Sequence, residues 1–114
     1  MEDVEVKAQN ISSNEKERHF RYLMEVKEIV FRFIPKNQAR VYLYGSWARR
    51  EERPTSDIDI GIYPLRELSP VLLSSLSEAL EESAVPYRVE IVNLNETSKA
   101  FRERVFEEGV SWNA

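Results

Sequence analysis

The sequence predicts an α/β (α+β) domain with a small mixed β-sheet and helices packed mainly on one face of the sheet. Three short segments have the two-residue hydrophobic alternation, or the β-branched and aromatic composition, of strands. Three longer segments have the spacing of apolar residues found in amphipathic helices. Their order along the chain is helix, strand, strand, helix, strand, helix, which is typical of a sheet covered by helices. The order of strands within the sheet does not follow from this pattern.

The chain has 114 residues, of which 42% are hydrophobic, and contains no internal repeat. This length suits one compact domain with one core and leaves no room for a second. We therefore expect residues 1–11 to form a flexible N-terminal arm and residues 12–114 to form the single domain.

The first helix is expected to follow Ser12, which precedes Glu15 by the three residues of a capping box. Apolar residues then recur at helical spacing and should form one buried face. They are Phe20, Leu23, Met24, Val30, Phe31 and Ile34. Pro35 ends this helix. His19 lies among charged neighbours and is interpreted as a solvated residue.

Two strands should follow, joined by a turn and a polar loop. Residues 41–44 are β-branched and aromatic, and residues 57–62 alternate strictly between polar and apolar side chains or glycine. Gly45-Ser46 ends the first of these strands, and residues 47–50 can form a short helical turn. Trp47 in this turn is expected to pack against the sheet in preference to stacking on a base.

The second helix is expected to begin with Ser69 as N-cap and Pro70 in the first helical position. Its inward residues are Leu72, Leu73, Leu76, Ala79 and Leu80, and it should end before Pro86. Residues 87–92 alternate again and predict the third strand. The last helix should cover about residues 97–108 and end at Gly109. The apolar residues from Phe101 to Val105, and Trp112, belong either to the core or to a partner-binding surface.

Composition excludes several function classes. The chain has no cysteine, so it has no disulfide and no thiolate metal site. No apolar run reaches the ~20 residues that span a bilayer, and residues 1–5 are too acidic and polar for a signal peptide. The formal net charge of −4 does not attract polyanions. We therefore expect a soluble, cytoplasmic protein that binds neither a membrane nor DNA or RNA directly.

The most informative segment contains Gly45-Ser46, a ten-residue spacer (residues 47–56) and Asp57-Ile58-Asp59. Side chains two residues apart on a strand point to the same face, about 6.6 Å apart. Asp57 and Asp59 should therefore stand side by side, and two such carboxylates repel unless a cation lies between them. Hard oxygen ligands of this kind suit Mg²⁺, with Mn²⁺ as the alternative.

The turn before these aspartates has the features of a phosphate site. Gly45 permits close approach of the backbone to a ligand, and amides at the start of a helical turn bind phosphate. The Ser46 hydroxyl and the Arg49 cation can add contacts to a polyphosphate, although Arg49 and Arg50 can also be read as exposed surface charges. Ser56 is a further candidate for nucleotide binding, with capping of the loop as its alternative.

A third carboxylate comes from the last predicted strand. Tyr87, Val89 and Ile91 form its apolar face, so Glu90 points the other way. If this strand lies beside residues 57–62, Glu90 joins the two aspartates. A two-metal site needs about this number of shared carboxylates. A solvent-exposed strand glutamate without a ligand role is the alternative interpretation.

Residues 15–112 resemble the minimal nucleotidyltransferases, a family within the DNA polymerase β-like superfamily. The resemblance rests on the strand ending in Gly45-Ser46, the spacer, the Asp57-x-Asp59 motif and the later acid Glu90. Two positions depart from the family pattern. Arg50 stands where the family usually has glycine, and Glu90 stands where aspartate is commoner, which puts metal geometry and turnover in doubt.

The resemblance implies that Asp57 and Asp59 bridge two Mg²⁺ ions, that Glu90 binds one of them and helps to deprotonate an acceptor hydroxyl, and that ATP is the substrate. It also implies an antitoxin that transfers AMP to a tyrosine of a HEPN-domain partner in a hetero-oligomer. Two alternatives stay open. The first is a non-catalytic antitoxin that occludes its HEPN partner, and the weaker second is modification of a small molecule such as an aminoglycoside.

Overall fold

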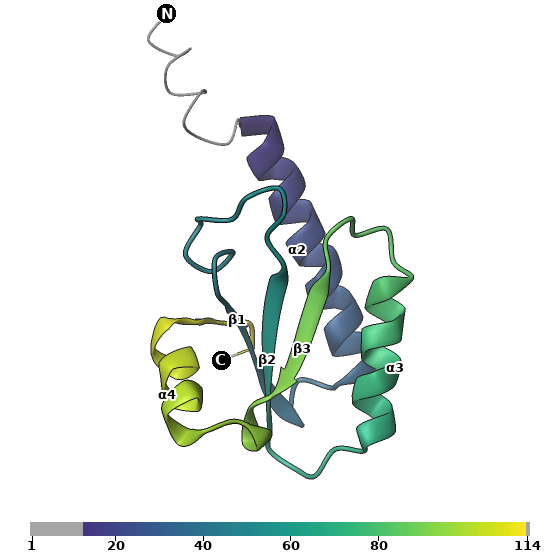
Figure 1. The fold of residues 1–114 in the computed structure, drawn as a ribbon. Coiled ribbons are helices and arrows are strands. Elements are labelled where there is room, and N and C mark those ends of the chain that lie inside the picture. Colours follow the sequence, from purple (N-terminus) through teal and green to yellow (C-terminus); the bar gives the residue numbers. More distant parts are fainter. Residues whose placement is uncertain (1–12, 114) are drawn as a thin grey trace, which may run out of the picture.

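A computed structural model describes residues 13–113 as a mixed four-stranded sheet with three α-helices (Figure 1). The elements in chain order are α2 (Ser13–Phe33), β1 (Ala39–Tyr44), β2 (Ile58–Pro64), α3 (Pro70–Glu81), β3 (Val89–Asn93), the 3₁₀ turn η1 (Leu94–Glu96), α4 (Lys99–Glu108) and β4 (Val110–Ser111). The predicted fold class is confirmed. The short strand β4 was not predicted.

The strand order in the sheet is β3-β2-β1-β4. β1 pairs antiparallel with both β2 and β4, whereas β2 and β3 are parallel. A parallel pair needs a crossover connection, and α3 supplies it. The starts of β2 and β3 and the end of β1 therefore lie at the same end of the sheet (Figure 1).

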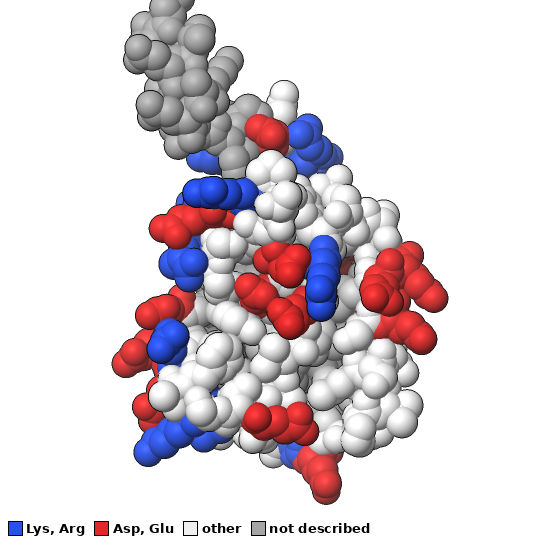
Figure 2. All heavy atoms as spheres, in the orientation of Figure 1, with Lys and Arg blue, Asp and Glu red and all other residues white. Residues whose placement is uncertain are grey.

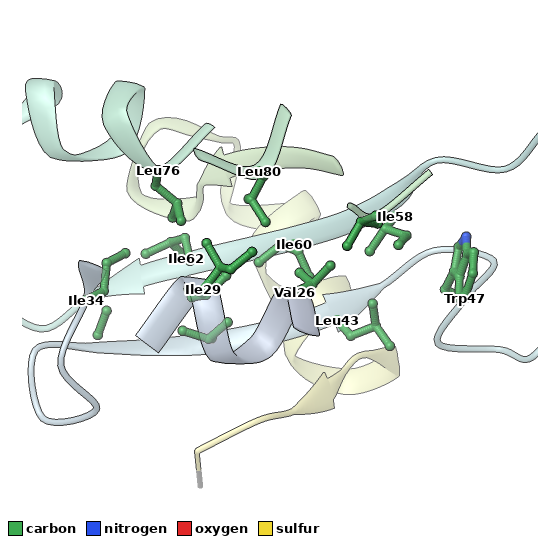
Figure 3. Packing of buried hydrophobic residues seen from close by; sticks show 14 residues of the cluster. Val26, Ile29, Ile34, Leu43, Trp47, Ile58, Ile60, Ile62, Leu76 and Leu80 are labelled. Carbon is green, nitrogen blue, oxygen red and sulfur yellow. The ribbon is translucent and has the colours of Figure 1, made fainter. Parts of the chain in front are cut away.

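The hydrophobic core lies between the sheet and the two helices α2 and α3 (Figures 1 and 3). Alternate residues of the two central strands point into it, and all are nearly or completely buried. They are Ala39, Val41 and Leu43 of β1 and Ile58, Ile60 and Ile62 of β2. From the helices, α3 adds Leu76 and Leu80, as its apolar spacing predicts.

Helix α4 packs against the opposite face of the sheet, beside β1. The Tyr42 ring lies 5.3 Å from the Phe106 ring, and the Tyr44 ring lies 5.7 Å from the Phe101 ring, measured between centroids. No helix lies in front of the starts of β2 and β3 in this view, whereas further along β2 the Tyr63 ring packs against Phe106 of α4 (Figure 1).

The buried face of α2 differs in part from the predicted one. Val30 is fully buried, as predicted, whereas Phe20 and Met24 are 63% and 46% exposed. Val26 and Ile29, which were not predicted to be inward, are buried. The buried stripe starts at His19, so it is rotated around the helix relative to the stripe of Phe20 and Met24. The interpretation of His19 as a solvated residue is also wrong, since only 9% of it is exposed.

Most predicted boundaries agree with the structure to within a few residues. The Ser69 side chain caps α3 by accepting from the Val71 amide, and Gly109 follows α4 as predicted. Asp57 lies just before β2, not within it. The predicted arm and the proposed Ser12 cap lie outside the described residues. Within residues 13–113, no helix combines the length and the apolarity that crossing a membrane requires.

Candidate active site

The parallel pair β2 and β3 brings two carboxylates together. Asp59 and Glu90 are register partners on these neighbouring strands, so their side chains lie next to each other on one face. Tyr44 of β1 is the partner of Asp59 on its other side. This row of three residues is on the face opposite the core. A group of acidic side chains lies near the centre of this face in Figure 2.

Asp57 joins this group from the segment that leads into β2. The amide of Ile58 donates to the Arg88 carbonyl oxygen at 2.9 Å, which fixes this segment against the approach to β3. Asp57 is close enough to Asp59 for its charge to raise the pKa of that carboxyl group. The three predicted acids, Asp57, Asp59 and Glu90, therefore converge on one end of the sheet.

Burial and neighbouring negative charges both act on the Asp59 carboxyl group. Burial, then the charges of Glu90 and Asp57, raise the pKa of Asp59 to about 6, and the nearby Arg49 only partly opposes them. Burial, then the charges of Asp59 and Glu90, raise the pKa of Tyr44 to about 12. A cation bound beside Asp59 would stabilise the ionised form of its carboxyl group.

Gly45 lies directly against the Asp59 carboxylate. Its φ is +77°, which is in the left-handed region that favours glycine. A Cβ atom at this position would overlap the Oδ2 atom of Asp59. Two independent features therefore require glycine at this position: the left-handed backbone conformation and the close approach of the turn to Asp59.

The turn that follows Gly45 is closed by its own backbone. The Gly45 carbonyl accepts from the amides of Ala48 and Arg49 at 3.1 and 3.2 Å, and the Ser46 carbonyl accepts from the Glu51 amide at 2.8 Å. Arg49 is exposed, and its Nε donates to Glu51 Oε1 at 3.0 Å. The predicted helical turn is present, and Ser46 and Arg49 lie in it next to the acid cluster.

Arg50 adopts a φ of +59°. It is the only non-glycine residue with positive φ among those the structure describes. The left-handed conformation costs an L-residue about 1–2 kcal/mol. The turn thus keeps the backbone that a glycine would favour, although this chain has arginine there.

Ser56 and Trp47 stabilise the loop between the turn and Asp57. The Ser56 hydroxyl oxygen accepts from the Arg53 amide at 2.8 Å, and the Ser56 carbonyl accepts from the Trp47 indole at 3.3 Å. Ser56 therefore has the capping role that was its alternative interpretation, and nucleotide binding by Ser56 stays a prediction. Trp47 is 3% exposed, so its predicted packing in the core is confirmed.

Asp57, Asp59 and Glu90 are the residues of this site that could hold a divalent cation. Their oxygen atoms are suitable ligands, and burial together with the charges of the other two acids raises the pKa of Asp59. However, no three acidic or histidine side chains within residues 13–113 are already arranged as a metal site. The donor set fits a cation whose coordination is completed by other ligands, such as phosphate oxygens.

A groove of about 750 Å³ lies elsewhere on the described surface. It runs between α2, residues 47–53 and the C-terminal strand, and the three acids do not line it. His19 and Glu52 lie at its wall. Sequence reasoning missed this buried pair, because its partners come from segments far apart in the chain.

Comparisons with known proteins agree with this geometry. Residues 25–111 match the family model described as polymerase beta, nucleotidyltransferase. The chain is 32% identical over 78 residues, or 68% of its length, to the probable protein adenylyltransferase MntA of Haemophilus influenzae, of which the match covers 67%.

Two solved structures share the fold. One is a toxin-antitoxin with AMP-PNP, with a TM-score of 0.65 and 27% identity over 78% of this chain and 71% of that one. The other is a tri-AMPylated Shewanella oneidensis HEPN toxin in complex with its MNT antitoxin, with a TM-score of 0.63, 24% identity and coverage of 84% and 73%. By its sequence match, this chain belongs to the polymerase beta nucleotidyltransferase family.

Proposed function

We propose that this chain is a Mg²⁺-dependent adenylyltransferase that moves AMP from ATP to a hydroxyl group of a HEPN-type toxin, and that it acts as the antitoxin of that partner. Its relative from Haemophilus influenzae has the name of a protein adenylyltransferase. A solved relative holds AMP-PNP, and the complex from Shewanella oneidensis contains an AMPylated HEPN toxin.

The observation that carries the proposal is the register of β2 and β3. It sets Asp59 beside Glu90, while the Gly45 turn touches Asp59 from the next strand. The turn that would bind phosphate thus lies directly against one of the acids that would hold the metal. Transfer of a nucleotidyl group requires both.

The proposed roles follow from position. Backbone amides after Gly45, the Ser46 hydroxyl and the Arg49 guanidinium would hold the triphosphate. Asp57, Asp59 and Glu90 would hold two Mg²⁺ ions, or Mn²⁺ in their place. When bound, these ions neutralise negative charge and make the α-phosphorus more electrophilic.

Glu90 is the more exposed acid of the strand pair, whereas Asp59 is half-buried. In the proposed mechanism Glu90 would take the proton of the acceptor hydroxyl. The hydroxyl oxygen forms a bond to the α-phosphorus, the bond to the β-phosphate oxygen breaks, and pyrophosphate leaves. Positioning of the two reactants supplies much of the rate.

The test is transfer of label from ATP carrying ³²P at the α-phosphate to the purified HEPN partner. We expect Mg²⁺-dependent labelling of a hydroxyl side chain by the wild-type chain and loss of labelling in Asp57→Asn and Asp59→Asn. Glu78→Gln, an exposed position on α3, is the matched control and should retain it. A folded wild-type complex that incorporates no label would exclude the catalytic proposal.

A second candidate is neutralisation of the partner by occlusion, without catalysis. Two positions favour it, since Arg50 stands where the family usually has glycine and Glu90 stands where aspartate is commoner. If occlusion is the function, Asp59→Asn should suppress the partner's toxicity as well as the wild-type chain does. If transfer is the function, the same variant should bind the partner and fail to suppress it.

A further inference from the structure

His19 of α2 contacts two distant segments that border the acid cluster. Its Nδ1 lies 2.8 Å from Glu52 Oε2, and its Nε2 lies 3.1 Å from the Tyr87 hydroxyl. Glu52 belongs to the loop between the Gly45 turn and Asp57, and Tyr87 precedes β3. Both ring nitrogens of one histidine are therefore engaged, each by a different part of the site's framework.

Carboxylate chemistry fixes the direction of one of these hydrogen bonds. An ionised carboxylate can only accept, so Nδ1 carries a proton and donates to Glu52. The Tyr87 hydroxyl can donate or accept, so its hydrogen bond with Nε2 takes the direction that the protonation of the ring sets. The side chains of His19 and Glu52 are only 11% and 10% exposed. At this burial each contact is shielded from competing water.

Aromatic contacts close the same cluster. The Trp47 ring lies 4.7 Å from the His19 ring and 4.9 Å from the Tyr87 ring, measured between centroids. Trp47 directly follows Ser46, and its indole donates to the carbonyl of Ser56, which directly precedes Asp57. The cluster therefore holds the loop at both of its ends, next to the phosphate turn and next to the first acid.

The contact with Tyr87 extends this control to the third acid. Arg88, the next residue, accepts from the Ile58 amide, and Glu90 follows two residues later on β3. Displacement of Tyr87 would thus disturb the approach of β3 to β2. Tyr87 packs against the hydrophobic core, whereas Glu90 is on the opposite face of the sheet.

A packing role alone does not explain these residues. Burying a histidine and a glutamate costs free energy that an apolar pair of similar size would avoid. Glu52 Oε1 is buried and has no hydrogen-bond partner among the described residues, which adds to that cost. Such polar networks specify one geometry where apolar contacts would permit several.

We propose that His19, with Glu52 and Tyr87, positions the nucleotide site: it fixes the loop of residues 46–56 and the start of β3 relative to α2, and so sets the phosphate turn against the acids. This inference rests on the proposed function, which identifies the ligand as a nucleotide. His19 is a positioning residue, since it touches neither the acids nor the turn's phosphate-binding atoms.

The experiment compares four variants of the whole chain. Tyr87→Phe removes one hydroxyl, His19→Leu removes both hydrogen bonds, and His19→Asn keeps an amide donor near the place of Nδ1. Tyr22→Phe is the matched control, because its ring packs 5.8 Å from Tyr87 but its hydroxyl makes no hydrogen bond within the described residues. Binding of α,β-methylene-ATP with Mg²⁺ is measured by calorimetry, and amide hydrogen exchange by mass spectrometry.

We expect His19→Leu and Tyr87→Phe to bind the nucleotide about tenfold more weakly. Loss of residues that orient the direct ligands of a metal has an effect of about this size. Exchange should accelerate in residues 46–56, whose amides close the turn, and stay unchanged in α3. His19→Asn should recover part of the affinity, and Tyr22→Phe should match the wild type. Both readouts are measured well below the unfolding temperature of every variant.

Three results would overturn the inference. One is wild-type affinity in His19→Leu, and another is equal acceleration of exchange in α3, which would indicate general destabilisation. The third is no recovery in His19→Asn when His19→Leu is impaired. If the wild-type chain binds no nucleotide, the proposed function fails, and unchanged exchange in residues 46–56 would separately show that the cluster does not hold the loop.

Discussion

Two residues beside the Gly45 turn occupy states that an isolated residue would not favour. Asp59 carries its carboxylate among other acids, and Arg50 has a left-handed backbone. Such features lower stability and are typical of functional sites, where the surrounding fold maintains them. Each can be tested by a single substitution whose effect has a predicted sign.

Asp59→Asn should make the metal-free protein more stable at pH 7.5. The pKa of Asp59 is about 6 in the folded chain, against roughly 3.9 when unfolded. The folded state therefore binds the Asp59 proton more tightly than the unfolded state does. The stability gained from this proton is fully present below about pH 4 and is lost as pH rises through 6. After allowance for solvent screening, we expect a gain of about 1 kcal/mol.

Urea unfolding in EDTA at pH 5 and pH 7.5 measures this effect. The wild-type chain should lose more stability between the two pH values than Asp59→Asn does, and Glu78→Gln should behave as the wild type. A destabilised Asp59→Asn at pH 7.5 would show that the carboxylate is already compensated.

Arg50→Gly should stabilise the chain by about 1 kcal/mol, because glycine adopts the left-handed conformation without steric cost. The matched control is Arg49→Gly, whose φ is not positive and which should lower stability. Chemical denaturation measures the free energy of unfolding of both variants and of the wild-type chain. Equal destabilisation by the two substitutions would mean that Arg50 makes contacts worth more than its backbone strain.

At the scale of elements, the end of the chain extends the sheet with a side chain. After β4, the Trp112 amide donates to the Val41 carbonyl at 2.8 Å. The Asn113 side chain then accepts from the Val41 amide at 3.0 Å and donates to the Ala39 carbonyl at 2.7 Å. One amide side chain thus imitates the next residue of a strand and satisfies backbone groups at the sheet edge.

Asn113→Ala should therefore release β4 from β1. The lost hydrogen bonds, which include one to the Lys36 carbonyl at 2.9 Å, should lower stability by about 2 kcal/mol. Hydrogen exchange should accelerate in residues 110–112 and at Val41 while the core helices are unaffected. Asn37→Ala, at a nearby exposed position, is the control. Unchanged exchange at the edge would show that β4 is held by its backbone alone.

At the scale of the whole molecule, an acidic protein presents an open acidic face. The formal net charge is −4, and the acid cluster lies on the part of the sheet that no helix covers (Figures 1 and 2). A nucleotide triphosphate is itself an anion and would be repelled there. Metal and nucleotide should therefore bind together far better than either binds alone.

Thermal unfolding with each ligand tests this coupling. ATP and Mg²⁺ together should raise the melting temperature, with a stabilisation of about 2.7 kcal/mol at a ligand concentration 100 times Kd. ATP in EDTA and Mg²⁺ alone should have little effect, and Asp57→Asn should abolish the joint effect. The joint effect should also weaken below about pH 6, where a proton competes for Asp59. Equal stabilisation by ATP without metal would contradict this account.

Local patterns in the sequence predicted the elements that depend on local chemistry. Strict alternation in residues 57–62 identified β2, and Ser69-Pro70 identified the start of α3 to the residue. The spacing of Gly45, Asp57 and Asp59, with the orientation of Glu90 on its strand, also predicted which side chains now lie together. Their roles as ligands stay predictions.

Long-range pairing could not be predicted in the same way. Nothing near His19 in the sequence indicates that Glu52 and Tyr87 will surround it, so a histidine among charged helix residues was assigned to solvent. The two-residue strand β4 is too short for a periodic signal and exists because the free edge of β1 accepts it. Phe20 and Met24 were assigned to the core because helical spacing identifies a stripe, whereas the position of the sheet decides which stripe is buried.

The parallel pairing of β2 with β3 has a consequence for how the protein is made. β1 and β2 can pair soon after synthesis, because a single connection joins them, but β3 reaches β2 only once α3 has crossed over the sheet. Contacts of this kind form late, since a longer stretch of chain must be ordered first. Glu90 reaches Asp59 only through this pairing, so the acids come together after α3 has crossed over the sheet.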